Sequence, residues 1–168
     1  MPELRTARLS LHPVDAAEAQ RILAGAAGPG ERWAPDYPFE GDLVALRAFL
    51  HATTTWGEQR PFGYYRISRR VDGLAVGGIG FTGPPVDGCV EIGYGVAPSG
   101  RGHGYAAEAV GALLAFAARR GLVRVTAQTS PDNLASHRTL LRAGLRPQGE
   151  ADGGLRRYAA LLAAGRES

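Results

Sequence analysis

Apolar and polar residues alternate in several short stretches of the chain, and this period of two predicts β-strands. Leu9 and Leu11 predict a first short strand. Three longer stretches, at 64–68, 75–82 and 89–96, are separated by the turn sequences VDG and PPVDG. Strands joined by turns this short pair antiparallel. The pattern therefore predicts an antiparallel meander in the middle of the chain.

Helical periodicity flanks this meander on both sides. Apolar residues three and four positions apart predict four helices, at 16–24, 43–51, 105–120 and 132–143. Three further strands are expected around the last two helices, at 123–128, 145–147 and 155–161. The order of elements predicts an α/β (α+β) fold, with a mixed, mostly antiparallel central sheet and flanking helices. The length of 168 residues suits a single domain over 1–168.

Composition narrows the function classes. The net charge of +3 comes from 19 basic and 16 acidic residues, and every basic one is an arginine. These arginines are spread along the chain, so no nucleic-acid partner is expected. No apolar run approaches ~20 residues and the first residues do not resemble a signal peptide, so we expect no membrane partner and a cytoplasmic location. One cysteine and four scattered histidines predict no metal site.

The strand CVEIGYGV has one nearly bare face. Val90, Ile92, Tyr94 and Val96 share one face, and Glu91, Gly93 and Gly95 share the other. Glycine in a strand interior marks either a bulge or a close approach of another group to the backbone. Both interpretations stay open at the level of sequence.

A glycine turn follows this strand directly. Gly100, Gly102 and Gly104 alternate with Arg101 and His103 before the helix at 105–120. The first N–H groups of a helix have no partner within the helix, and glycines let an anionic phosphate approach them. Arg101 adds a positive charge. The alternative is a strand-turn-helix connection whose glycines serve only tight packing.

The glycine spacing alone leaves the phosphate ligand open. Residues 102–107 read G-x-G-x-x-A, one form of the dinucleotide fingerprint. That motif requires a βαβ unit and an acidic residue about 20 positions later. Gln128 stands near that position, and the preceding strands are predicted antiparallel. A dinucleotide-dependent enzyme is therefore the less favoured alternative.

The stretch GYGVAPSGRGHGYAAEAV resembles the acetyl-CoA-binding segment of the GNAT superfamily of N-acetyltransferases. The family signature Q/R-x-x-G-x-G/A falls on Arg101, Gly104 and Ala106. A second stretch, SPDNLASHRTLLRAGL, resembles the segment after the fifth strand in the ribosomal-protein-alanine acetyltransferase branch. The resemblance extends over nearly the whole chain.

The resemblance implies acetyl-CoA as cosubstrate and a strand pair splayed apart by a bulge, with the pantetheine arm in the gap. The implied cofactor-binding residues are Tyr94, Gly95, Val96, Arg101, Gly102, His103, Gly104, Tyr105, Ala106, Asn133 and Ser136. Asn133 has a second interpretation as a helix cap, a role that asparagine fills well.

Acetyl transfer to an amine requires oxyanion donors, a proton acceptor and an acid for the departing thiolate. In this family the amine usually attacks the thioester directly, without an acyl-enzyme. The resemblance also implies a backbone N–H at the end of the fourth strand as oxyanion donor, here that of Val96. Glu91 is the candidate base, acting through a water, and the alternative is a surface carboxylate. Ser136 is the candidate acid because Leu140 occupies the position where many members have a tyrosine. A cofactor-binding or helix-stabilising Ser136 is the alternative.

The acceptor is expected to be a primary amine, on a small molecule or at a peptide N-terminus, with a monomer or homodimer as the working species. Its binding site is predicted around the loop at 31–42 and two aromatic residues beyond it. The candidate residues are Trp33, Asp36, Tyr37, Glu40, Trp56 and Tyr64. Another branch of the family has a glutamate five residues before the asparagine, and Gln128, which occupies that position here, cannot act as a base. Because Gln128 and Leu140 leave the proton-handling groups open, a non-catalytic acyl-CoA-binding regulatory module is the alternative function.

Overall fold

Nine strands form one mixed sheet in the computed structural model, which describes residues 3–163. The strands are β1 (Leu4–Arg5), β2 (Leu9–Pro13), β3 (Arg32–Trp33), β4 (Tyr64–Arg69), β5 (Leu74–Phe81), β6 (Cys89–Val96), β7 (Arg124–Thr129), β8 (Arg146–Glu150) and β9 (Arg156–Leu161). Their order is β1-β2-β4-β5-β6-β7-β9-β8, with β3 beside β5. Only the β6–β7 and β3–β5 pairs are parallel. The predicted meander β4-β5-β6 is confirmed.

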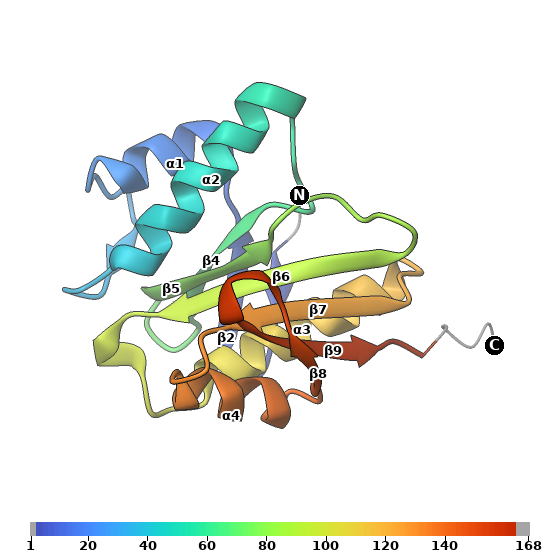
Figure 1. Cartoon of the computed structure of the whole chain (residues 1–168). Coiled ribbons are helices and arrows are strands. Elements are labelled where there is room, and N and C mark those ends of the chain that lie inside the picture. Colours follow the sequence, from blue (N-terminus) through green and yellow to red (C-terminus); the bar gives the residue numbers. More distant parts are fainter. Residues whose placement is uncertain (1–2, 164–168) are drawn as a thin grey trace.

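Helices cover both faces of this sheet. They are α1 (Ala16–Leu23), α2 (Glu40–Trp56), α3 (Tyr105–Arg119) and α4 (Leu134–Arg142). The helices α1 and α2 lie together on one face, and α3 and α4 lie on the other (Figure 1). In the part of the chain that is described, no helix combines the length and apolarity needed to span a bilayer.

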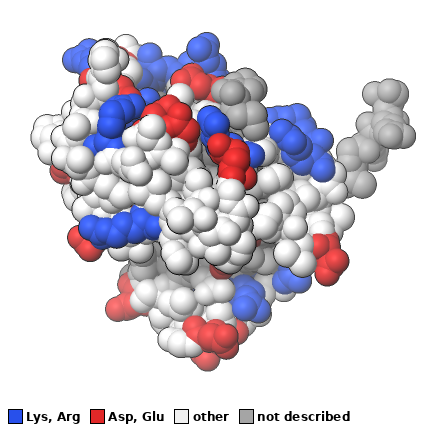
Figure 2. Space-filling view, turned by 90° about the horizontal axis from the view of Figure 1, so that it is seen from above, with Lys and Arg blue, Asp and Glu red and all other residues white. Residues whose placement is uncertain are grey.

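The core forms where α3 packs on the central strands. Leu11 of β2, Ile67 of β4, and Val110 and Leu113 of α3 are completely buried. Leu11 and Ile67 each lie between polar neighbours in their strands, and Val110 and Leu113 lie three positions apart in the helix. This spacing produces the apolar faces that the sequence pattern predicts. On the opposite side, seen from above, basic and acidic side chains are interspersed around a mostly uncharged centre (Figure 2).

The helix α2 is longer than the sequence pattern predicts. It begins at Glu40 rather than Leu43 and continues to Trp56. The last residues of the predicted loop form its first turn, in which the Asp42 Oδ2 atom accepts a hydrogen bond from the Phe39 N–H at 3.2 Å. Apolar periodicity does not detect this turn because its residues are glycine and acids. Likewise, β1 and β3 have only two residues each, too few to show a period.

The sheet opens between β6 and β7. Their pairing ends at Ile92 opposite Ala127, although both strands continue. Beyond this point β6 stays paired with β5 as far as Val96, and β7 stays paired with β9 as far as Thr129. The predicted splayed pair is therefore present. The predicted bulge is wrong for this strand, because β6 pairs with β5 without a register shift, and the opening arises because the two strands follow different neighbours.

Candidate active site

The segment Gly93–Val96, called here the open edge of β6, presents backbone groups to the opening. The Thr82 N–H donates to the Glu91 carbonyl at 2.9 Å, and the Ala97 N–H donates to the Val76 carbonyl at 2.7 Å. The odd-numbered residues of β6 therefore bond to β5. Backbone groups in an antiparallel pair alternate in direction. The N–H and C=O groups of Tyr94 and Val96 therefore point toward β7, where no strand pairs with them.

Val96 keeps its N–H available while its carbonyl is occupied. The Arg101 Nε atom donates to the Val96 carbonyl at 2.9 Å, and the Arg101 guanidinium lies 5.6 Å from the centre of the Phe39 ring. Arg101 thus holds the end of β6 beside the start of α2. The Val96 N–H, predicted as the oxyanion donor, remains directed into the opening.

Gly95 contributes differently from the prediction. Its own N–H and C=O groups face β5, so it cannot bond a ligand in the opening through them. A Cβ atom placed on Gly95 would lie 2.5 Å from the Phe39 Cζ atom. The close approach predicted for the bare face of β6 is therefore made at this position by the chain's own phenylalanine.

The glycine turn leaves the first amides of α3 open. Gly102 and Gly104 adopt positive φ angles of +83° and +78°, which residues with a Cβ adopt only at a cost. The first helical bond runs from Glu108 N to Gly104 O at 3.1 Å. Within the described chain, no hydrogen bond uses the backbone N–H groups of residues 102–107. A Cβ on Gly102 would meet no atom within 4 Å, so the turn borders open space at Gly102.

Two arginines from distant segments flank this turn. A Cβ placed on Gly104 would lie 3.5 Å from Arg8 Nη2 and 3.6 Å from Arg142 Nη1. Arg8 donates to the His103 carbonyl at 2.8 Å and pairs with Glu108 at 2.8 Å. The sequence does not reveal these arginines, because Arg8 precedes His103 by 95 residues. The charge of Arg8 is paired with Glu108, whereas no ion pair among the described residues includes Arg142, which therefore adds positive charge beside the open amides.

The two candidate residues of α4 lie at the same opening. Asn133 caps the helix, with its Oδ1 atom accepting from the Ser136 N–H at 3.2 Å. The helix-cap interpretation is therefore confirmed, while cofactor contact stays a prediction. The Ser136 hydroxyl lies 2.7 Å from the Tyr94 hydroxyl of β6. Burial raises the pKa of Tyr94 to about 12, so its phenol is neutral at physiological pH.

The neighbouring positions on α4 serve structure. Leu140 is completely buried in the core. The His137 ring bonds through Nδ1 to the Tyr158 hydroxyl at 2.6 Å and through Nε2 to the Pro131 carbonyl at 3.0 Å. Tyr94 of β6 places a phenol beside Ser136, whereas the buried position 140 holds leucine. The Tyr94 hydroxyl was missed because the resemblance assigns only its backbone.

A cavity of about 370 Å³ adjoins the open edge of β6 on the α2 side of the sheet. Its walls come from α2, β4, β5 and β6, and three residues of the open edge, Gly93, Tyr94 and Gly95, line it. The apolar side chains in its lining are Val44, Ala45, Ala48, Phe49, Ala52, Phe62, Ile79 and Phe81. This apolar cavity gives a second ligand access to the same backbone that faces the opening.

Glu91 lies next to the apolar cavity rather than in its wall. Its Oε2 atom accepts from the Thr82 hydroxyl at 3.0 Å, and Thr82 lines the cavity. The side chain is partly exposed. The role of Glu91 as a base acting through a water stays a prediction.

The structure brings only one of the predicted acceptor residues, Tyr64, into the cavity lining. Tyr37 lies behind it, with the two hydroxyls 3.3 Å apart. Asp36 instead accepts from the Ser99 N–H and hydroxyl at 2.7 and 2.6 Å. Trp56 is largely exposed. Trp33 and Glu40 are also absent from the lining.

Asp42 is the acid that sequence reasoning missed. Only 2% of its surface is exposed, and it lines the apolar cavity. Its Oδ1 atom accepts from the Tyr64 hydroxyl at 3.0 Å, in addition to the Phe39 bond. Burial raises its pKa to about 6, so it is ionised above that pH. The signal was an acid three residues after Phe39, in what the sequence pattern left as loop.

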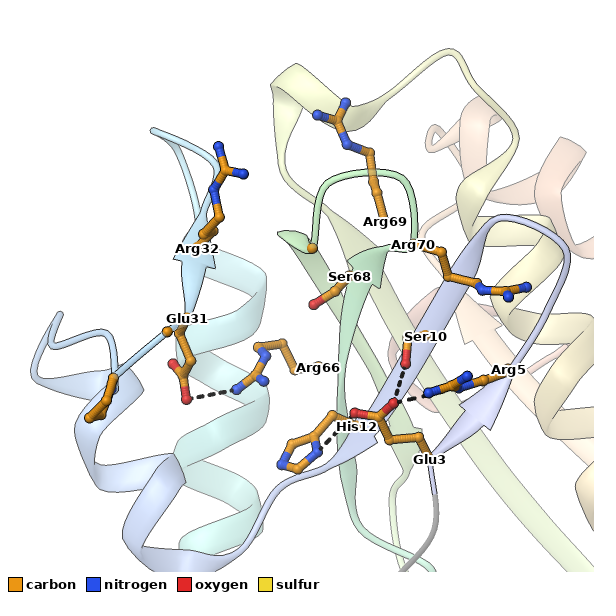
Figure 3. A pocket seen from close by; sticks show the side chains of 13 residues that line it. Glu3, Arg5, Ser10, His12, Glu31, Arg32, Arg66, Ser68, Arg69 and Arg70 are labelled. Carbon is orange, nitrogen blue, oxygen red and sulfur yellow. Dashed lines mark hydrogen bonds and ion pairs between the residues drawn. The ribbon is translucent and has the colours of Figure 1, made fainter.

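A second cavity, of about 520 Å³, lies over β2 and β4 and shares no lining residue with the first. Five arginines line it: Arg5, Arg32, Arg66, Arg69 and Arg70. Figure 3 shows Arg66 turned toward Glu31, with an ion pair of 3.3 Å, and Arg5 and His12 turned toward Glu3. Its basic lining disfavours a cationic amine. The apolar cavity is therefore the better acceptor site.

Three features occur together here: a sheet that opens between β6 and β7, a helix start with unpaired amides beside the opening, and a cavity that adjoins β6 on the α2 side. Together they are typical of an acyl-CoA-dependent acetyltransferase fold. The chain matches the acetyltransferase (GNAT) domain over residues 8–146 and belongs to this family, as the resemblance predicts. A relative is an uncharacterized N-acetyltransferase, YjdG of Bacillus subtilis (strain 168), 44% identical over 111 residues. That match spans 65% of this chain and 66%, just under two thirds, of the relative.

Solved structures agree along nearly the full length. The acetyltransferase from Agrobacterium tumefaciens str. C58 is 27% identical, with a TM-score of 0.67 and coverage of 95% of this chain and 94% of that one. The ribosomal L7/L12 α-N-protein acetyltransferase RimL, in complex with coenzyme A, is 21% identical, with a TM-score of 0.67 and coverage of 96% and 99%. At that identity the likeness to RimL is one of fold.

Proposed function

We propose that the protein transfers the acetyl group of acetyl-CoA to a primary amine by direct attack. The observation that carries the proposal is the open edge of β6, which faces the opening toward β7 with its backbone and lines the apolar cavity. A thioester bonded along this edge is accessible to a nucleophile from the cavity. No covalent enzyme intermediate is then required.

The cofactor fits the two groups of open backbone donors. The amides of Gly102, His103, Gly104, Tyr105 and Ala106 would hold the pyrophosphate, because a helix start with unpaired N–H groups attracts an anion. Arg142 adds positive charge on one side of the turn, next to Arg8 and its partner Glu108. Backbone groups of Tyr94 would bond the pantetheine arm, and the Val96 N–H would bond the thioester carbonyl. Asn133 keeps its side-chain N–H₂ group for the same ligand.

The chemistry needs three proton transfers: two from the nitrogen and one to the leaving thiolate. The ammonium loses a proton, through a water, to Glu91, and the free nitrogen attacks the thioester carbon. The new C–N bond forms while the carbonyl oxygen takes up negative charge, which the Val96 N–H stabilises. The C–S bond then breaks, and the Ser136 hydroxyl, bonded to Tyr94, donates a proton to the thiolate. Ser136 regains a proton, through water, from the second N–H of the attacking nitrogen, and Glu91 releases the first proton to solvent. The products are an acetamide and coenzyme A, with one proton released overall.

The cavity favours a small-molecule amine over a peptide N-terminus, since about 370 Å³ holds a drug-sized ligand rather than an extended peptide. Proteins of this fold differ in this respect. RimL is described as an α-N-protein acetyltransferase, whereas the self-immunity acetyltransferase MccE, 15% identical to this chain, was crystallised with acetyl-CoA and AMP.

Two assays test the proposal. Calorimetry with acetyl-CoA, and with nicotinamide cofactors as a control, is expected to give binding only for acetyl-CoA. Thiol release is then measured at pH 8 with amino acids, polyamines, apolar amines and N-terminal peptides. Turnover with peptides alone contradicts the preference for small molecules. Tight acetyl-CoA binding without turnover on any amine supports the regulatory module instead.

A further inference from the structure

The apolar cavity contains a single charged side chain. Among the residues that line it, Asp42 is the only acid, and no arginine or histidine is present. The lining also includes Tyr64, whose phenol is neutral because burial raises its pKa, and Tyr94, whose phenol lies on the α4 side of the sheet against Ser136. An ionised Asp42 therefore makes the cavity negative as well as apolar.

Asp42 has no cationic partner among the described residues. The ion pairs of the structure do not include it, and its two hydrogen bonds come from a phenol and a backbone N–H. A carboxylate has about four acceptor positions, so each oxygen can accept a further bond. A buried charge without a counter-ion costs free energy. A cation bound in the cavity would remove that cost.

Helix capping alone does not explain this burial. Asp15 also caps a helix start: it is the N-cap of α1, its Oδ1 atom accepts from the Glu18 N–H at 2.8 Å, and it remains partly exposed. Capping therefore requires an acid at the helix start but not one that is only 2% exposed and bonded to the Tyr64 hydroxyl. The additional feature at Asp42 is the cavity.

We propose that Asp42 binds the ammonium group of the acceptor while the walls of the apolar cavity bind an apolar body attached to it. The substrate class is then a primary amine on a compact apolar group, in preference to polyamines, zwitterionic amino acids and acidic amines. This inference rests on the proposed function and names the acceptor class for the same site. Glu91 remains the separate proton acceptor.

A binding experiment tests the inference without turnover. Calorimetry with the protein and coenzyme A at pH 8 compares the affinities of phenethylamine and its neutral analogue 2-phenylethanol. Phenethylamine is a cation at this pH because alkylammonium pKa values are about 10. We expect the amine to bind at least about tenfold tighter, since a desolvated charge pair contributes 1.4 kcal/mol or more. Asp42→Asn should abolish this preference, and Asp15→Asn, the matched cap variant, should retain it.

Equal binding of the two ligands to the parent protein, or an unchanged preference in Asp42→Asn, overturns the inference. Should Asp42→Asn fail to fold, Ala48→Phe replaces it, because Ala48 lies on the exposed side of α2 and lines the cavity. This variant fills the apolar part of the site. It should weaken phenethylamine binding at least about tenfold and leave coenzyme A binding unchanged. Unchanged amine binding contradicts the inference here as well.

Kinetics separate the inference from the proposed function. In thiol release with phenethylamine, Asp42→Asn should raise the KM for the amine at least about tenfold and leave the KM for acetyl-CoA unchanged. Acetylation of amines with no change in this KM rejects Asp42 as the binding group while the proposed function stands. Charge-dependent binding of phenethylamine without acetylation rejects the proposed function while the binding site stands.

Discussion

The hydroxyls of Tyr94 and Ser136 lie 2.7 Å apart and connect β6 to α4 across the opening in the sheet. Tyr94 also donates to the Ser136 carbonyl at 3.2 Å. The two residues are 42 positions apart in the chain, so only the fold brings them together. Beyond Ile92, where pairing of β6 with β7 ends, this contact joins the open edge of β6 to the next layer.

If this pair protonates the departing thiolate, removing either hydroxyl should slow turnover. Ser136→Ala is expected to lower kcat at least about tenfold, because positioned proton donors typically contribute 10²–10⁴-fold and a water replaces part of the effect. Tyr94→Phe should lower it by a similar factor. Because the two act together, the double variant should lose little more than either single one. Unchanged kcat with normal acetyl-CoA affinity would remove both from the proton path.

The open amides of the glycine turn make a prediction about cofactor affinity. Gly102→Ala places a methyl group where a Cβ meets no protein atom within 4 Å, so its steric effect falls on a bound ligand. Calorimetry should show coenzyme A binding weakened at least about tenfold.

A matched control separates this effect from backbone strain. Gly121 has φ +76°, also has open space around its Cβ position, and lies at the far end of α3. Gly121→Ala should lose a similar amount of thermal stability, about 1–2 kcal/mol, and bind coenzyme A normally. Equal affinity in the two variants argues against a phosphate site at the turn.

Glu91 is expected to influence the rate and not cofactor binding. Glu91→Gln should lower kcat by about 10²-fold or more, most strongly at low pH where free amine is scarce, with an unchanged KM for acetyl-CoA. Thr82→Val keeps the carboxylate and removes only its hydroxyl partner, so it should have a much smaller effect. A loss under about threefold at every pH would make Glu91 a surface carboxylate.

Burial of Asp42 predicts a pH-dependent cost to stability. Its folded pKa of about 6 exceeds the ordinary 3.8, so the folded state binds more protons than the unfolded state between these values. The stability that Asp42 contributes is therefore present at acidic pH and falls by about 3 kcal/mol as pH rises through this interval. The phenols facing it, Tyr64 and Tyr37, have raised pKa values and do not titrate there.

Asp42→Asn removes this dependence. Denaturant unfolding from about pH 4 to about pH 8 should show the variant gaining stability relative to the parent protein as pH rises, with a constant difference above pH 7. Asp15→Asn, on the exposed cap of α1, should show no such gain. Parallel stability curves for Asp42→Asn and the parent protein would contradict the raised pKa.

Periodicity predicts most of the fold because its long elements have one apolar face. The meander and α3 follow directly from alternation and from spacing of three and four residues. The start of α2 could not be predicted this way, since its first turn consists of Glu40, Gly41 and Asp42. That boundary mattered, because it concealed Asp42 within a segment interpreted as loop.

The site was predicted where its chemistry lies in a contiguous segment. The glycine turn is visible in sequence because it joins a strand to a helix. Arg8, Arg142 and the Tyr94–Ser136 contact depend on segments that the fold brings together from far along the chain. Gly95 shows the converse: its missing side chain suggested ligand contact, yet it accommodates Phe39.

The most direct test of acetyl transfer is an acetyl balance with acetyl-CoA and phenethylamine. The sequence contains no lysine, so no side-chain amine of the protein competes as acceptor. Thiol release is followed while mass spectrometry quantifies N-acetylphenethylamine. The account predicts equal molar amounts of thiol and acetylated amine, both abolished without protein. Thiol release without acetylated product, or no release despite bound acetyl-CoA, would contradict it.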